Sequence, residues 1–180
     1  ELWRALSDRA SYSSPILIEQ AGKQVLVIWT GDNVTGLNPD DGSVYWNVPF
    51  RQSRSDINIA MPVIQWPYMF ISCFYDGSML IKLSEGSTSA SMVWHRKGES
   101  ERKTDALHCI ISTPFIQGEH VYGVDSYGEF RCLDLMTGDR VWEDQTLTPY
   151  GRWSNAHFVF DRDRFWAFNE KGELVLGKVS

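Results

Sequence analysis

The stretch Cys132-Leu133-Asp134-Leu135-Met136-Thr137-Gly138-Asp139-Arg140-Val141-Trp142 decides the fold of this 180-residue chain. It places a turn with Thr137 and Gly138 between two short segments, and a tryptophan follows the glycine four residues later. A looser copy stands 96 residues earlier as Gly36-Leu37-Asn38-Pro39-Asp40-Asp41-Gly42-Ser43-Val44-Tyr45-Trp46. Because glycine readily adopts the positive φ angles that tight turns need, both stretches are predicted to be β-hairpins.

These features return at a regular interval along the chain. Four tryptophans lie 43, 48 and 48 residues apart, and a small or apolar residue followed by proline keeps phase with them. The tryptophan, the proline pair and the turn are thus three markers that recur with the same period. They indicate a repeat of about 45 residues, the length of a propeller blade. The tryptophans are Trp3, Trp46, Trp94 and Trp142, and the proline pairs are Ser14-Pro15, Met61-Pro62 and Thr113-Pro114, with Ala156-His157 as a fourth copy without proline.

Each period is predicted to consist of short antiparallel strands. No segment keeps apolar residues at helical spacing for three turns, so no long helix is expected. The sequence therefore predicts an all-β protein, a β-propeller with four-stranded antiparallel blades and about four blades in this chain. The expected blades are 7–50, 56–97, 106–145, and 154–180 completed by residues 1–6.

Composition narrows the class of protein further. The chain is 43% hydrophobic and 22% charged, with eight tryptophans and 14 glycines, as expected for a globular all-β protein. A net charge of −6 argues against a nucleic-acid or anionic-membrane surface. The longest apolar run, 25–29, is far shorter than the ~20 residues of a membrane helix. Cys73, Cys109 and Cys132 form no Cys-x-x-Cys pair. One disulfide among them is compatible with the sequence, and the cysteines do not identify the redox compartment.

The segment 132–142 resembles the repeat of pyrroloquinoline-quinone-type propellers, A-x-D-x-x-T-G-x-x-x-W, with Cys132 in place of the first alanine. The resemblance implies that the tryptophan packs between adjacent blades and that the turn residues have a structural role. The residues carried over in this way are Trp3, Trp46, Trp94, Trp142, Gly42, Asp134, Thr137 and Gly138. Relatives with this repeat are typically eight-bladed, so the chain looks like half of a ring, the C-terminal half of a larger propeller.

The two ends of the chain look complementary. Residues 1–6 carry an outer-strand tryptophan with no blade before it, and residues 173–179 supply an inner strand with no outer strand after it. We expect residues 2–5 to pair with 173–179, which would remove an exposed strand edge. A head-to-tail homodimer or a longer chain accounts for this best, and a closed four-bladed monomer is the third alternative.

The resemblance also raises the question of quinone chemistry. Quinone dehydrogenases of this superfamily hold a calcium ion and use a vicinal cysteine pair, and the sequence has neither such a pair nor an Asp-x-Asp-x-Asp loop. Asp161 and Asp163 are interpreted as a solvated hairpin turn. We therefore assign no catalytic, cofactor-binding or metal-binding residues and expect no cofactor. The expected function is a non-catalytic scaffold that binds a protein or a small ligand, similar to BamB-type outer-membrane assembly lipoproteins; the alternative is a quinone-dependent dehydrogenase. Only the resemblance suggests a periplasmic or cell-envelope location.

Two hairpin loops are candidates for a binding surface. Tyr75-Asp76 and Asp125-Ser126-Tyr127 occupy the same turn in neighbouring periods, and Arg131 follows on the next strand. An exposed tyrosine beside a charge is typical of binding loops, although an ordinary hairpin explains these residues without any further role. His108 and His157 lie near the starts of innermost strands, where they would line the channel or cap loop backbone. The candidate surface is therefore Tyr75, Asp76, His108, Asp125, Tyr127, Arg131 and His157, whereas 96–103 is interpreted as a solvated loop.

Overall fold

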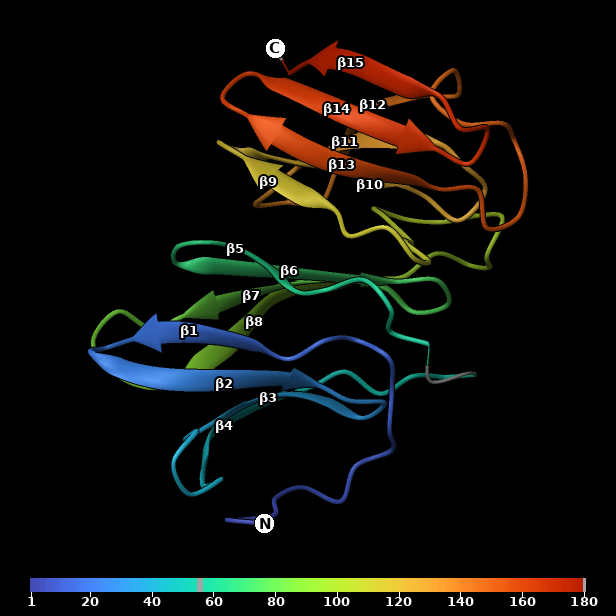
Figure 1. Cartoon of the computed structure of the whole chain (residues 1–180). Helices are drawn as coiled ribbons and strands as arrows, with labels where there is room; N and C mark the ends of the chain where they lie inside the picture. The colour runs from blue at the N-terminus through green and yellow to red at the C-terminus, as the bar shows by residue number, and fades with distance from the viewer. Residues whose placement is uncertain (55–56, 180) are drawn as a thin grey trace.

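The computed structural model describes residues 1–54 and 57–179, and these form four antiparallel sheets stacked one above the next (Figure 1). In each sheet the strands pair in chain order, and we number the sheets as blades 1 to 4. Blade 1 contains β1 (Ile16–Gln20), β2 (Lys23–Trp29), β3 (Asn33–Leu37) and β4 (Val44–Pro49). Blade 2 contains β5 (Val63–Gln65), β6 (Tyr68–Cys73), β7 (Gly77–Leu83) and β8 (Ala90–Arg96).

Blade 3 contains β9 (Phe115–Gln117), β10 (His120–Val124), β11 (Phe130–Asp134) and β12 (Arg140–Asp144). Blade 4 has three strands, β13 (Ala156–Asp161), β14 (Arg164–Asn169) and β15 (Leu174–Lys178). The prediction of an all-β protein built from propeller blades is confirmed. The outer limits expected for blades 2 and 4, Asp56 and Ser180, lie outside the described residues. Across 1–54 and 57–179, no helix could span a membrane.

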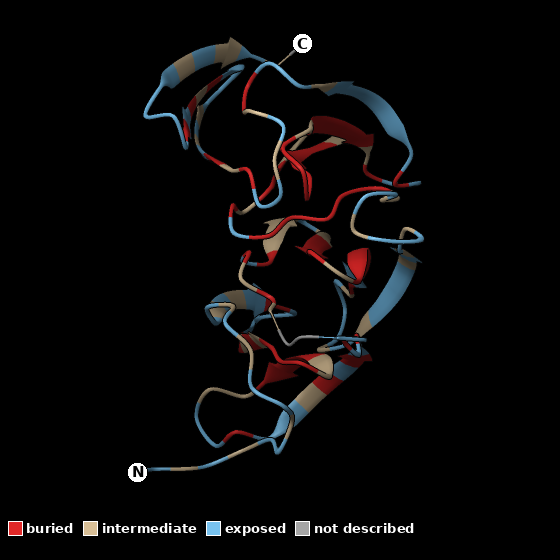
Figure 2. Cartoon of the chain, turned by 90° about the vertical axis from the view of Figure 1, so that its right-hand side faces the viewer, coloured by how far each residue is buried: buried red, intermediate tan, exposed pale blue. Residues whose placement is uncertain are grey.

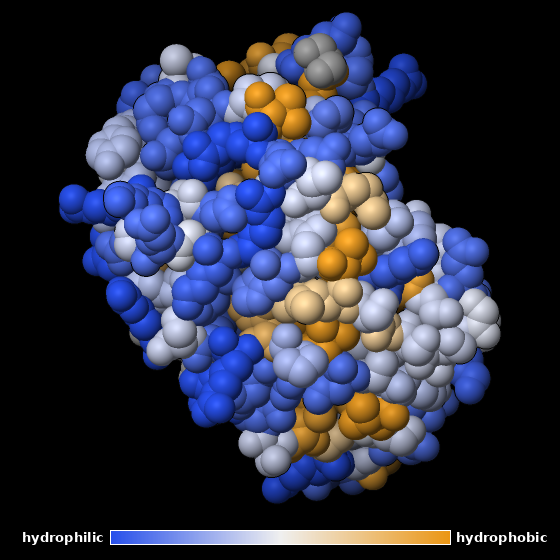
Figure 3. All heavy atoms as spheres, turned by 180° about the vertical axis from the view of Figure 1, so that it is seen from behind, coloured by the Kyte–Doolittle hydropathy of each residue, from blue (hydrophilic) through white to orange (hydrophobic). Residues whose placement is uncertain are grey.

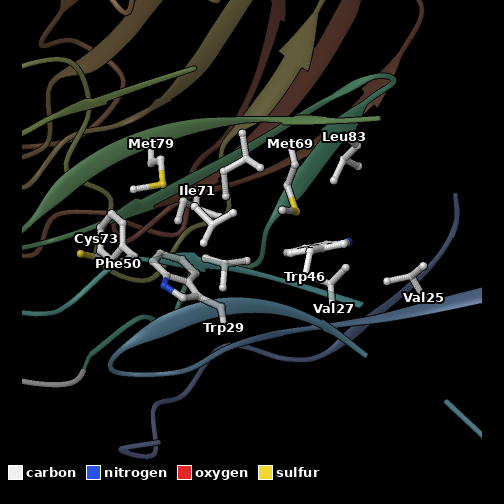
Figure 4. Close-up of a cluster of buried hydrophobic side chains, with 13 residues drawn as sticks. Val25, Val27, Trp29, Trp46, Phe50, Met69, Ile71, Cys73, Met79 and Leu83 are labelled. Carbon is white, nitrogen blue, oxygen red and sulfur yellow. The ribbon is translucent and has the colours of Figure 1, made fainter. Parts of the chain in front are cut away.

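The blades are held together by apolar clusters between neighbouring sheets. Along β2, Val25, Val27 and Trp29 are buried and face blade 2, where they meet Met69 and Ile71 of β6 (Figure 4). Similar clusters join blades 2 and 3 and blades 3 and 4. Figure 2 shows the burial pattern: buried segments lie between the sheets, and much of the outermost strands is exposed. Packing between blades, more than within one sheet, therefore supplies the core.

The repeated tryptophans hold one position in three blades. Trp46, Trp94 and Trp142 lie opposite Gly36, Leu80 and Cys132, next to an irregularity in the pairing of the third and fourth strands. Trp46 is buried, and the Trp94 indole Nε1 donates a 3.1 Å hydrogen bond to the carbonyl oxygen of Leu135 in the next blade. This position sets each indole ring against the following blade.

Trp142 departs from the expected burial between blades, since its exposed fraction is 38%. Its ring contacts Tyr122 and Phe130 of its own blade and lines a groove with Val179 of blade 4. Val179 has the same place in blade 4 that Leu135 has in blade 3. The backbone N–H of Val179 donates to the carbonyl oxygen of Asp163, as the N–H of Leu135 donates to the carbonyl oxygen of Glu119. The turn that follows Leu135 covers the ring of Trp94. The described residues of blade 4 end at Val179 and include no corresponding turn over Trp142.

The N-terminal segment lies against blade 1, and the two termini are at opposite ends of the molecule (Figure 1). Residues 1–15 form no strand. The indole Nε1 of Trp3 donates to the carbonyl oxygen of Pro39 at 3.0 Å, and Arg9 forms a 2.9 Å ion pair with Asp32. The expected pairing of residues 2–5 with 173–179 therefore does not occur within one chain, because contacts with blade 1 hold the segment elsewhere.

Candidate functional site

The long connections between blades and the hairpins after the second strands gather at one side of the molecule, the right-hand side of Figure 1. The second and fourth strands of an antiparallel blade run in the same direction, so their ends share one side. This side brings together the hairpins at 74–76 and 125–129 and the connections 97–114 and 145–155. It contains most of the predicted site residues.

A buried ion pair forms the base of this region. Arg131 Nη1 lies 2.8 Å from Asp125 Oδ1, and both side chains are at most 5% exposed. Asp125 also accepts hydrogen bonds from the backbone N–H of His108 at 2.6 Å and from Thr104 Oγ1 at 2.7 Å. Because a buried carboxylate needs such partners, Asp125 fixes the connection 97–114 onto blade 3.

Asp76 has the corresponding role in blade 2. Its carboxylate accepts hydrogen bonds from Lys97 Nζ at 2.6 Å and from the backbone N–H of Ser53 at 3.0 Å. Burial disfavours the charged form, but the hydrogen bonds from Lys97 and Ser53 outweigh it, so the pKa of Asp76 is lowered. Asp76 is thus an ionised structural anchor.

His108 is fully buried beneath the same surface. Its Nε2 accepts a 3.2 Å hydrogen bond from the backbone N–H of Gly98, so Nδ1 carries the proton and donates to the carbonyl oxygen of Phe74 at 2.9 Å. Burial lowers the pKa of His108, with the charge of Asp125 opposing this effect. The imidazole therefore acts as a neutral bridge between two loops.

Above this buried layer lies a group of residues that we call the tyrosine–arginine cluster: Tyr75, Glu101, Arg102, Tyr127 and Arg152. The Tyr127 hydroxyl donates to Glu101 Oε1 at 3.0 Å and accepts from Arg102 Nε at 3.2 Å. Arg152 Nη2 lies 2.8 Å from Glu101 Oε2 and donates to the Tyr75 hydroxyl at 3.3 Å. Glu101 and Arg152 thus connect the two loop tyrosines of neighbouring blades.

Two aromatic side chains project from this cluster into solvent. Tyr150 is 66% exposed and Trp153 is 51% exposed. Trp153 has φ of 73°, a conformation that is costly for a large side chain. Its backbone N–H donates to the carbonyl oxygen of Ser126 at 3.0 Å, and the Arg152 guanidinium lies 4.8 Å from the centre of its ring. The loop therefore presents the indole outward in a fixed orientation.

The structure places the seven candidate surface residues in three environments. Asp76, His108, Asp125, Arg131 and Tyr127 are buried, so the expectation of an exposed Tyr127 at a loop tip is wrong. Contacts with Glu101 and Arg102 cover its ring. Tyr75 is half-buried within the cluster, and His157 lies on the exposed outer face of β13, away from the cluster between blades 3 and 4.

Five residues of this surface were not predicted from the sequence: Glu101, Arg102, Tyr150, Arg152 and Trp153. The segment Tyr150-Gly151-Arg152-Trp153 has the composition of a binding loop, which is the one signal that points to it. The segment 96–103, interpreted as solvated, instead supplies Glu101 and Arg102 to the cluster.

The donor set does not fit the calcium and quinone of the propeller dehydrogenases. Within 1–54 and 57–179 no three His, Cys, Asp or Glu side chains lie together as metal ligands would. Asp161 and Asp163 are exposed, and Asp163 pairs with Lys178 at 3.2 Å. The three cysteines are free and buried, and burial raises the pKa of Cys73 to about 12. A buried thiol of this kind is unreactive.

Comparisons with known proteins agree with the blade architecture. The solved structure of BamB from Moraxella catarrhalis has a TM-score of 0.66 at 13% identity, covering 99% of this chain and 55% of BamB. The chain thus spans about half the length of that protein. The computationally designed Ika4 protein has a TM-score of 0.63 at 11% identity, covering 100% of this chain and 98% of Ika4. The designed Ika8 protein has a TM-score of 0.58 at 8% identity, covering 91% and 45%. At these identities the likeness concerns the fold.

The sequence comparisons give the family. No curated protein sequence matches the chain. The family model described as outer membrane protein assembly factor BamB matches residues 1–144, which include the three complete blades and their tryptophans. The match covers most of this chain and its repeat of propeller blades. The chain therefore belongs to the BamB family.

Proposed function

We propose that the chain is a non-catalytic scaffold that binds a protein partner on the surface formed by Tyr75, Tyr150, Arg152 and Trp153. The observation that carries the proposal is the conformation of Trp153, an exposed indole on a left-handed backbone. Such a conformation persists only where the surroundings enforce it, and it is found at functional positions more often than elsewhere.

The residue types on this surface support a protein partner. Tryptophan, tyrosine and arginine dominate the binding energy of protein interfaces. Arg152 is held between the rings of Phe74 and Trp153 by cation–π contacts of 5.5 and 4.8 Å, and by its ion pair with Glu101. A surface fixed in this way loses little conformational entropy on binding, so more of the contact energy appears as affinity.

The family supports the same choice of partner class. The matched family is named for a factor in outer membrane protein assembly, so a protein partner agrees with it better than a small ligand does. The absence of a fitting donor set among the described residues gives no support to quinone binding. The partner is expected to offer an apolar pocket for Trp153.

Site-specific photo-crosslinking in the native host tests the proposal. A photoreactive phenylalanine analogue replaces Trp153 in one variant and Tyr150 in another, and Met92, 54% exposed on β8, serves as the control position. We expect one discrete protein adduct from both test positions and none from Met92. Adducts of equal yield from all three positions, or none from Trp153 and Tyr150, would contradict the proposed surface.

A further inference from the structure

Blades 3 and 4 have the same strand register at a spacing of 44 residues. In blade 3, Tyr122 lies opposite Phe115 on one side and Cys132 on the other. In blade 4, Trp166 lies opposite Val159 and Leu176, each 44 residues later. Residues 159–161, 164–168 and 174–178 of blade 4 therefore have counterparts in β9, β10 and β11.

This correspondence explains the exposed face of blade 4. Blade 3 packs against blade 4 through five buried residues, and each of their counterparts in blade 4 is also hydrophobic. Trp166 is half-buried, and the other four are 53–67% exposed on the face turned away from blade 3. The buried residues are Phe115, Tyr122, Val124, Phe130 and Cys132, and the counterparts are Val159, Trp166, Phe168, Leu174 and Leu176. Figure 3 shows apolar atoms at this end of the molecule, at the top of the view. A soluble protein rarely leaves such a face uncovered.

The edge of β15 is open as well. In the three complete blades, the third strand pairs with an outer strand whose tryptophan lies opposite Gly36, Leu80 or Cys132. The counterpart of Cys132 in blade 4 is Leu176, and β15 pairs only with β14 among the described residues. An outer strand that brings a tryptophan opposite Leu176 would complete this blade.

Trp3 already has the contacts of such a tryptophan. Trp94 donates to the carbonyl oxygen of Leu135 at 3.1 Å, and its ring lies over Gly138. Trp3 donates to the carbonyl oxygen of Pro39 at 3.0 Å, and its ring lies over Gly42. Pro39 and Gly42 precede Leu135 and Gly138 by 96 residues, the spacing that also separates Trp46 from Trp142. Trp3 therefore meets blade 1 as an outer-strand tryptophan meets the following blade.

We propose that two copies of the chain join head to tail, with residues 2–5 of each copy forming the fourth strand of blade 4 in the other. The pairing of β11 with β12 fixes the register: Trp3 lies opposite Leu176, Arg4 opposite Val175, and Ala5 opposite Leu174. The outer face of blade 1 then covers the exposed face of blade 4. One contact thus pairs the open edge of β15 and covers the apolar face of blade 4.

Closure after two copies agrees with the size of related rings. The chain covers 55% of BamB and 45% of Ika8, so two copies have about the length of either protein, whereas one copy has the length of Ika4, of which it covers 98%. Each copy supplies one blade-4 face and one Trp3 strand, so two identical contacts close the ring and leave none open.

Light scattering on the purified 180-residue chain gives the first test. We expect a mass of about 41 kDa, twice the 20.6 kDa of one chain. Leu176→Lys should reduce the mass to 20.6 kDa while the circular dichroism spectrum is unchanged, because Leu176 is 58% exposed in a single chain. Met92→Lys, at a residue 54% exposed on another strand, should keep the 41 kDa mass. A wild-type chain of 20.6 kDa, or a Leu176→Lys variant that stays at 41 kDa, would overturn the proposal.

Cysteine crosslinking tests the register. Ala5→Cys with Leu174→Cys should form a disulfide between copies under mild oxidation, whereas Leu2→Cys with Leu174→Cys should not, because in this register Leu2 lies too far along the strand. The native cysteines are buried and do not compete. Equal crosslinking of both pairs, or of neither, would contradict the proposed pairing of residues 2–5 with β15.

Discussion

The indole Nε1 of Trp46 donates a 3.0 Å hydrogen bond to Oε1 of Gln20, within the same blade. The Gln20 amide in turn donates to the carbonyl oxygens of Ser84 and Ser89 in blade 2, at 3.2 and 2.7 Å. Trp94 and Trp3 each donate directly to a backbone carbonyl oxygen. Between blades 1 and 2, by contrast, the side chain of Gln20 links Trp46 to the carbonyl oxygens of the neighbouring blade. Blade 2 has a serine-rich turn at this place, residues 84–89, and Gln20 connects Trp46 to it.

Replacement of Trp46 by alanine should cost about 3–5 kcal/mol of unfolding free energy, because a fully packed aromatic ring is removed from the core. Trp142→Ala should cost distinctly less, since Trp142 is 38% exposed and Trp46 only 5%. Urea unfolding followed by circular dichroism measures both. Equal losses would contradict the difference in packing between the two interfaces.

Removal of the cation from the buried ion pair should be strongly destabilising. Arg131→Met leaves the Asp125 carboxylate without its charged partner, at a cost of about 3–5 kcal/mol. Lys103→Met is the matched control, because its pair with Glu99 is exposed at both ends and exposed pairs contribute about 0–1 kcal/mol. Melting temperatures of the two variants measure the difference. Values within 2 °C of each other, which correspond to a difference in unfolding free energy of roughly 1 kcal/mol or less, would contradict the prediction.

The buried imidazole predicts a pH dependence of stability. The pKa of His108 is lowered in the folded chain, so the unfolded chain takes up a proton first as the pH falls below the ordinary value of 6.5. The contribution of His108 is therefore complete above pH 6.5 and is lost as the pH falls toward the pKa of the folded state. His108→Gln should flatten the fall in stability between about pH 6.5 and 5, and His157→Gln, at an exposed position, serves as the control variant. Melting temperatures of the three proteins across this range give the answer, and parallel curves for wild type and His108→Gln would contradict it.

Quinone binding is expected to be absent. The cofactor of the propeller dehydrogenases is held through calcium, and the described residues bring no three acidic or histidine side chains together. Titration of the chain with pyrroloquinoline quinone and calcium should give no saturable absorption change. A stoichiometric complex with a dissociation constant below about 1 μM, some 8 kcal/mol of binding energy, would overturn this expectation.

The strands and turns could be predicted from local sequence. The Thr137-Gly138 turn and its copy at Asp41-Gly42 have φ of 73° and 75° at the glycines, as such turns require. These signals are local because a hairpin is formed by residues close in sequence.

The exposure of individual side chains could not be predicted in the same way. The environment of Trp142 depends on Phe165, Val175 and Val179 of blade 4, and that of Tyr127 depends on Glu101, 26 residues away. Arg152 reaches Glu101 across 51 residues through two irregular connections that carry no strand periodicity. The loops could be identified as candidates, but their mutual contacts are long-range and leave no local pattern.

The central claim is that the surface around Trp153 binds a protein, and an affinity measurement on the crosslinked partner tests it most directly. With that partner purified, Trp153→Ala should weaken binding about 30-fold or more, the equivalent of a 2 kcal/mol hot spot. Its melting temperature should stay at the wild-type value, and Met92→Ala should bind within about twofold of wild type, as expected outside the interface. Wild-type affinity in the Trp153→Ala variant would contradict the account.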